Sequence, residues 1–166
     1  MTKNYKNEKT YRYIFIVDSI ILLSSNILQD KQVEDAHSLN KIEEQLQVLI
    51  AESEIELLLL FTAYLSSLGI RTETVRTGDE AIYQFFKRKD KRPYDAIVLD
   101  THLYSPSGLD VAKKIHSEKT DQKLVLVTTT PIEYLSKECL KTAGITDRDI
   151  LTMPFKLSNL VEVLKN

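Results

Sequence analysis

A single carboxylate, Asp100, ends the apolar run AIVLD and is the residue of this chain best placed to do chemistry. Strands rich in Ile, Val and Leu are usually buried on both faces of a parallel sheet, and such sheets bind ligands at the carboxyl ends of their strands. The segment QVLIAESE also ends in acids, Glu52 and Glu54. Two strands that deliver carboxylates to one sheet edge form an oxygen-rich pocket suited to a hard divalent cation. The structural alternative is that Asp100 caps the loop that follows it.

The segments that must position these acids alternate between strand-like and helix-like patterns from residue 46 onwards. Residues 47–51 and 71–75 are predicted strands, and residues 78–87 are a predicted helix. Between the two strands, Gly69 closes a helix whose apolar side chains recur at helical spacing: Leu57, Leu58, Phe61, Leu65 and Leu68. This alternation predicts a doubly wound α/β fold.

Composition restricts the classes of function. The chain has 166 residues, is 43% hydrophobic and carries a formal charge of −2, so it suits one domain with an extension and has no general attraction to nucleic acid. The single Cys139 excludes an intramolecular disulfide and is predicted to be a buried structural thiol in a reducing compartment. The sequence contains no Gly-rich phosphate loop, Ser/His/Asp triad pattern or Cys/His metal cluster, which argues against the corresponding enzymes.

Residues 1–45 fall outside the alternating pattern and are predicted to form an N-terminal extension. MTKNYKNEKT is polar and is expected to be mobile, whereas YRYIFIVDSIILLSSNIL is strongly apolar. Asp18 near its centre, and a length below the ~20 apolar residues of a spanning helix, argue against a signal peptide or membrane span. We expect residues 13–28 to bury their apolar side against protein. The charged residues 33–45 are predicted to form an amphipathic helix, laid on the rest of the chain or on a second copy.

Ordered motifs between Leu46 and Asn166 resemble the receiver domain of two-component response regulators. VLIAESE and the following IELLLLFTAYLSSLG resemble its first strand, acidic turn and first helix. IVLDTHLYSPSGLDVAKKI resembles the phosphoacceptor strand, with Gly108 eight residues after Asp100. LVLVTTTP resembles the fourth strand, and ILTMPFKLSNLVEVL the fifth strand, the Pro-Phe turn and the last helix. Over residues 46–166 the resemblance implies the flavodoxin-like receiver fold, a five-stranded parallel sheet of order 2-1-3-4-5.

The resemblance also implies roles for individual residues. Asp100 would be the phosphoacceptor, and Thr128 the switch hydroxyl that closes onto the phosphoryl group. A Mg²⁺ ion would lie between Glu52, Asp100 and the main-chain carbonyl of His102, because phosphoryl transfer to a carboxylate needs a cation that neutralises the phosphoryl oxygens. The His102 side chain is expected at the surface, since one imidazole among oxygen ligands suits Mg²⁺ poorly.

Three positions depart from the family pattern. Ser53 stands where receivers usually carry a second acid, so it would offer the metal only a hydroxyl, and Mg²⁺ binding is expected to be weak. Met153 stands before Pro154 where most receivers carry a Lys, and Met has neither a charge nor a hydrogen-bond donor. Lys156 lies beyond the Pro-Phe turn and is not expected to replace that Lys. Ile150 stands where the family carries the aromatic partner of the switch.

The implied function is phosphorelay signal transduction, not enzymatic catalysis. A stand-alone cytoplasmic receiver would accept a phosphoryl group on Asp100 from a histidine kinase or phosphotransfer protein and act on a downstream protein partner. Neither nucleic acid nor a membrane is an expected partner, and a homodimer is an open alternative. The rival hypothesis is a pseudo-receiver, an interaction module without phosphoryl chemistry. A flavin or nucleotide site at the same edge is disfavoured, because the acids of AESE would repel a phosphate.

Overall fold

The computed structural model describes residues 46–166, in which strands and helices alternate along the chain. The strands are β1 (Gln47–Ala51), β2 (Arg71–Val75), β3 (Ala96–Asp100), β4 (Lys123–Thr128) and β5 (Ile150–Thr152). The α-helices are α2 (Ile55–Ser67), α3 (Gly78–Arg88), α4 (Gly108–Glu118), α5 (Lys137–Thr142) and α6 (Leu157–Lys165), with short 3-10 helices η2 (Ile132–Tyr134) and η3 (Asp147–Asp149). The predictions for residues 1–45 lie outside the described residues.

The strands form one parallel sheet in the order β2-β1-β3-β4-β5. This arrangement confirms the predicted doubly wound, flavodoxin-like fold of order 2-1-3-4-5. The order reverses direction between β1 and β3, so the loops that follow these two strands leave the carboxyl edge of the sheet on opposite sides, which is where folds of this class bind ligands. Within residues 46–166, no helix is both long and apolar enough to cross a lipid bilayer.

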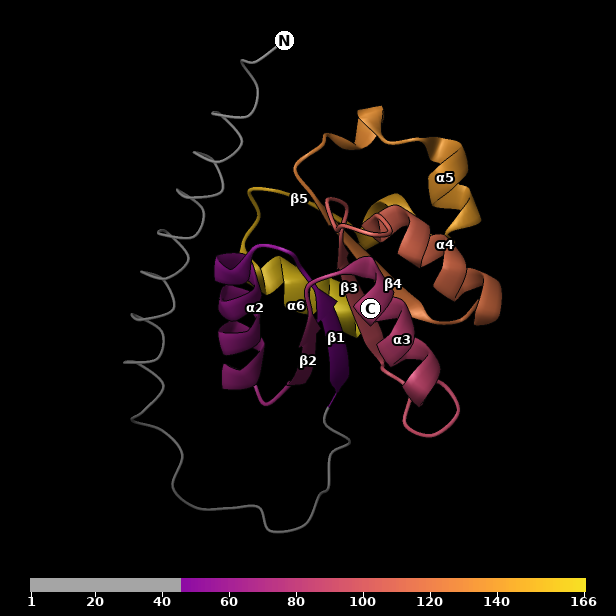
Figure 1. Ribbon diagram of the computed structural model, residues 1–166. Coiled ribbons are helices and arrows are strands. Elements are labelled where there is room, and N and C mark those ends of the chain that lie inside the picture. Colours follow the sequence, from indigo (N-terminus) through magenta and orange to yellow (C-terminus); the bar gives the residue numbers. More distant parts are fainter. Residues whose placement is uncertain (1–45) are drawn as a thin grey trace, which may run out of the picture.

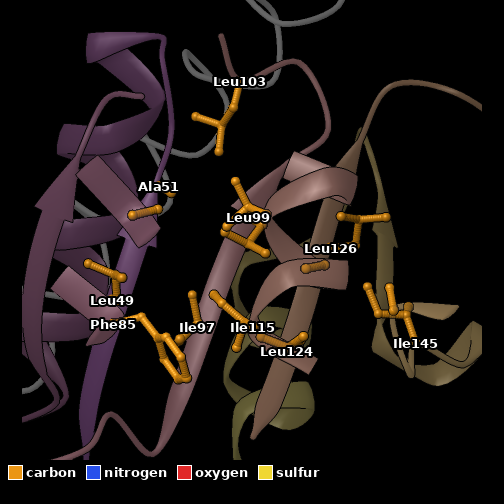
Figure 2. Packing of buried hydrophobic residues seen from close by; sticks show 14 of the residues in the cluster. Leu49, Ala51, Phe85, Ile97, Leu99, Leu103, Ile115, Leu124, Leu126 and Ile145 are labelled. Atoms are coloured by element: carbon orange, nitrogen blue, oxygen red, sulfur yellow. The ribbon is translucent and has the colours of Figure 1, made fainter. Parts of the chain in front are cut away.

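Helices cover both faces of the sheet (Figure 1). Successive residues of β1 point to opposite faces: Val48 and Ile50 pack with α2 and α6, whereas Leu49 and Ala51 pack with α3, α4 and α5. Figure 2 shows the second of these clusters, in which Phe85, Ile97 and Ile115 lie together between the sheet and the helices. The central strand β3 is buried along its whole length, which explains its uninterrupted apolar sequence. Asp100, at its end, is the exception in that run.

Local sequence signals set the helix boundaries. α3 begins after Thr77, whose hydroxyl accepts the Glu80 N–H at 3.3 Å while the Glu80 carboxylate accepts the Thr77 N–H at 3.2 Å. This reciprocal cap favours a helix start at Gly78, as predicted, and α3 ends one residue later than predicted. α2 ends before Gly69, whose φ of 74° is the left-handed conformation that the sequence predicts for it.

Leu68, the last apolar residue of the predicted helical pattern, is the C-cap of α2 and is 50% exposed. One side-chain prediction is wrong. Cys139, predicted to be a buried structural thiol, is only half-buried. It lies in the short helix α5, where interactions with Ser136 and then with Lys113 lower the pKa of its thiol.

Candidate functional site

The carboxyl edge of the sheet collects the side chains that the sequence predicts to do chemistry. Glu52 follows β1, Asp100 ends β3 and Thr128 ends β4, and β3 lies between β1 and β4. The exposed fraction is 1% for Glu52 and Asp100 and 0% for Thr128. Burial of polar groups at the end of an apolar sheet is unfavourable unless hydrogen bonds or ions satisfy them, so this edge is the candidate site.

Asp100 is held by the residues that follow it. One carboxylate oxygen, Oδ1, accepts the backbone N–H of His102 at 3.1 Å. The His102 ring nitrogen Nδ1 lies 3.4 Å from the same oxygen, while 43% of the side chain is exposed. The predicted surface position of His102 therefore holds, but the contact of its imidazole with Asp100 was not predicted. No sequence pattern signals it, because the contact depends on the turn that the backbone makes after β3.

The acidic turn after β1 has its own set of contacts. The Glu52 oxygen Oε1 accepts the backbone N–H of Glu54 at 2.8 Å, and the Glu52 N–H donates to the Val75 carbonyl at 3.1 Å. Ser53 is half-buried, and its carbonyl accepts a hydrogen bond from the Arg76 guanidinium at 3.1 Å. A positive charge thus stands next to the acidic turn. Arg76 was not predicted as a site residue, although its position directly after β2 places it at the same sheet edge.

Thr128 is tied to neighbours on both sides. Its hydroxyl oxygen accepts the backbone N–H of Thr130 at 3.0 Å and the hydroxyl of Thr101 at 3.1 Å. Its carbonyl accepts the Met153 N–H at 2.8 Å. Thr101 was not predicted as a site residue. The only sequence signal for it is its position after Asp100, which sets it beside the end of β4, where its N–H donates to the Val127 carbonyl at 2.9 Å.

Two of the three positions that depart from the family pattern, Met153 and Ile150, pack into the hydrophobic clusters on the two faces of the sheet. Met153 packs against the hydrophobic cluster that joins the sheet to α2 and α6, and Ile150 is 7% exposed within the cluster of the opposite face. Lys156 is exposed at the N-terminal cap of α6.

The donor set at the edge has the chemistry of a magnesium site. The carboxylates of Glu52 and Asp100, the Ser53 hydroxyl and the His102 carbonyl are all oxygen ligands, the type that hard divalent cations prefer. Within residues 46–166, no group of three or more His, Cys, Asp or Glu side chains is arranged to hold a metal ion. The residues therefore fit Mg²⁺ in ligand type, but with few charged ligands.

Comparison with known proteins agrees with this geometry. Arabidopsis thaliana two-component response regulator 24 is 26% identical over 125 residues, which cover 75% of this chain and 86% of the relative. Response regulator TrrA from Thermotoga maritima, whose structure was determined in complex with Mg²⁺-BeF, is 27% identical, with a TM-score of 0.63. The match covers 73% of this chain and 97% of the TrrA chain. The receiver domain of Francisella response regulator 1452, 21% identical, shares the fold with a TM-score of 0.62 over 73% of this chain and 94% of its own.

The family model provides the decisive match. The response regulator receiver domain model matches residues 48–165, which is almost the whole described part of the chain and nearly the range predicted from the motifs. With a sheet of the family's order and Asp100 buried at the end of β3, the chain belongs to the response regulator receiver domain family of two-component systems.

Proposed function

We propose that this receiver accepts a phosphoryl group on Asp100 from the phosphohistidine of a histidine kinase or phosphotransfer protein. In this transfer a carboxylate oxygen forms a bond to phosphorus while the P–N bond of the phosphohistidine breaks, and the imidazole leaves with the bonding electrons. The observation that carries the proposal is the placement of the buried Asp100 beside β4, whose last residue, Thr128, has a hydroxyl able to donate to a phosphoryl oxygen.

Mg²⁺ is part of the proposal. Glu52, Asp100 and the His102 carbonyl would hold the ion, with the Ser53 hydroxyl in place of a second acid. When bound, the ion would neutralise charge on the phosphoryl oxygens. The complex of TrrA with Mg²⁺-BeF supports this assignment for a related protein. Weak binding is expected here, because Ser53 adds no charge and the Arg76 guanidinium stands at the Ser53 carbonyl.

Glu52→Gln is expected to weaken Mg²⁺ binding and to raise stability at low Mg²⁺, since it removes one of two buried carboxylates at the same edge. For the wild type, Mg²⁺ at about ten times Kd should add about 1.4 kcal/mol to the free energy of unfolding. Thermal melts with increasing MgCl₂ measure both effects. Glu56→Gln, in the first turn of α2 and exposed, is the matched control and should respond to Mg²⁺ as the wild type does. A wild-type melting temperature that does not change at tens of millimolar Mg²⁺ would exclude the metal site.

The pseudo-receiver is the second candidate, and the packing of Met153 favours it. A receiver that lacks the usual Lys before Pro154 lacks one group that stabilises the transferring phosphoryl group. Met153, which stands in its place, packs against the hydrophobic cluster on α2 and α6. In that case the chain would bind a protein partner with no change at Asp100. Both candidates are signalling modules, and both act through contacts with other proteins.

Intact mass spectrometry tests the first proposal against the second. Wild-type protein, incubated with a small phosphodonor such as acetyl phosphate and Mg²⁺, should gain the mass of one phosphoryl group, and Asp100→Asn should not. Asp110→Asn, an exposed acid in the first turn of α4, should gain the same mass as the wild type. A wild type that stays folded and gains no mass at any phosphodonor concentration would support the pseudo-receiver.

An exposed apolar face of α2 is a candidate contact surface for the N-terminal residues. The outward face of α2 presents Ile55 and Leu59, one helical turn apart and 48% and 63% exposed. We propose that the apolar residues 13–28 pack on this face or on the same face of a second copy in a homodimer. A cytoplasmic location stays a prediction of the same proposal.

A further inference from the structure

Thr101 and His102, which follow Asp100, connect it to Thr128 through a continuous set of polar contacts. The His102 ring nitrogen Nδ1 lies 3.4 Å from Asp100 Oδ1 and 3.1 Å from the Thr101 hydroxyl oxygen. The Thr101 hydroxyl donates to the Thr128 hydroxyl at 3.1 Å, and the Thr128 oxygen also accepts the Thr130 N–H at 3.0 Å. The contacts thus run from the end of β3 to the loop that follows β4.

The direction of the Thr101–Thr128 hydrogen bond decides where the other hydrogen atoms of this set lie. Thr101 has one hydroxyl hydrogen, which points to Thr128, so towards His102 its oxygen is the acceptor. This requires a hydrogen on Nδ1 of His102, which a neutral imidazole provides in one of its two tautomers. The Thr128 oxygen accepts two hydrogen bonds, from Thr101 and from Thr130. Both of its lone pairs are then used, and the group that Thr128 can still offer is its own hydroxyl hydrogen.

We infer that Thr101 is a positioning residue for the reaction at Asp100, because its hydroxyl orients Thr128 with the Thr128 hydrogen directed to a phosphoryl oxygen. The inference rests on the proposed function. A hydroxyl that rotates freely must be oriented in the transition state, whereas one that is already oriented needs no reorganisation. This matters most in a receiver where Met153 contributes no donor, since Thr128 then carries a larger share of the stabilisation.

The same contacts give a path for the signal. A phosphoryl group on Asp100 would meet the Thr128 hydroxyl, and Thr128 is hydrogen-bonded to the backbone of Thr130 in the loop between β4 and η2. Movement of Thr128 therefore changes the hydrogen bonding of this loop directly. The path runs through β3 and β4 and needs no aromatic residue at position 150.

Thr101→Val tests the positioning role, because Val keeps the shape of Thr and loses only the hydroxyl. We expect its maximal phosphorylation rate to fall about two- to tenfold, the range set by one net hydrogen bond, with the half-saturating phosphodonor concentration unchanged. Thr101→Ser restores the hydroxyl and should restore the rate.

Thr152→Val is the matched control. Thr152 lies in register with Thr128 on its other side, and its buried hydroxyl has no hydrogen-bond partner among the described residues, so the substitution should leave the rate at the wild-type value. Equal rates for wild type and Thr101→Val would overturn the inference and leave the proposed function standing. A wild type that gains no Asp100-dependent phosphoryl group would overturn both.

A second measurement follows the contacts without phosphoryl chemistry. In amide NMR spectra of the unphosphorylated protein, Thr101→Val should shift the Thr130 signal and speed its hydrogen exchange, because the acceptor of that N–H is no longer held by Thr101. Thr101→Ser should return the signal to its wild-type position, and Thr152→Val should change it less than Thr101→Val does. A Thr130 amide that is the same in Thr101→Val and wild type would overturn the inference.

Discussion

Met153→Lys is expected to raise the rate of Asp100 phosphorylation about a hundredfold or more, because one preorganised donor at a developing charge commonly contributes about 3 kcal/mol. The backbone at this position is already in place. The Met153 N–H donates to the Thr128 carbonyl at 2.8 Å, and Thr128 ends the strand next to that of Asp100. A Lys side chain that starts from this point is long enough to bring its ammonium group to the phosphoryl oxygens at the sheet edge.

The rates are compared by intact mass over a time course, with the same phosphodonor and Mg²⁺ concentrations. Met153→Leu is the matched control, since Leu keeps an apolar side chain against the cluster on α2 and α6 and should leave the rate unchanged. Melting temperatures of both variants separate the loss of packing from the effect on the reaction. Equal Asp100-dependent rates for wild type and Met153→Lys would show that another group already fills the role of the missing cation.

The fold could be predicted from the sequence because its signals are local. Uninterrupted apolar strands such as β3 indicate burial on both faces, and the cap residue Thr77 and the glycine Gly69 mark helix ends. Glu52 and Asp100 could be predicted for the same reason, because an acid directly after a buried strand has only the sheet edge to occupy.

The contacts of Thr101, His102 and Arg76 could not be predicted in this way. Each contact depends on the direction of a side chain. Those of Thr101 with Thr128 and of Arg76 with Ser53 join residues that follow or end different strands, and that of His102 with Asp100 depends on the turn after β3. The half-buried Cys139 has a similar cause. Its segment forms only a short helix, which leaves the thiol at a helix start and beside Lys113 of α4. Hydrophobic periodicity gives no information on such arrangements.

Gly108 has a steric role that the motif alone does not explain. It is the first residue of α4, and a Cβ atom built there would overlap the carbonyl oxygen of Asp100 and lie 2.7 Å from its carbonyl carbon. Both are backbone atoms, so no side-chain rotation relieves the overlap. Either α4 must move away from β3, or the backbone that carries Asp100 and His102 must shift. The absence of a side chain at Gly108 therefore helps to set the position of Asp100.

Gly108→Ala is accordingly expected to destabilise the protein by about 3 kcal/mol, the upper part of the range for an overpacked interior site, although Ala is the better helix former. Chemical denaturation measures the loss. Lys137→Ala is the control. Lys137 is the exposed first residue of α5, and Ser136 caps α5 as Ser107 caps α4. This substitution should change the free energy of unfolding by no more than about 0.5 kcal/mol. The Gly108→Ala variant should also phosphorylate more slowly under conditions where it is fully folded, because Asp100 would be shifted relative to the end of β4, where Thr128 lies. A Gly108→Ala protein as stable as the wild type would mean that the backbone after β3 yields easily, and Asp100 would then not be held in place by its contact with α4.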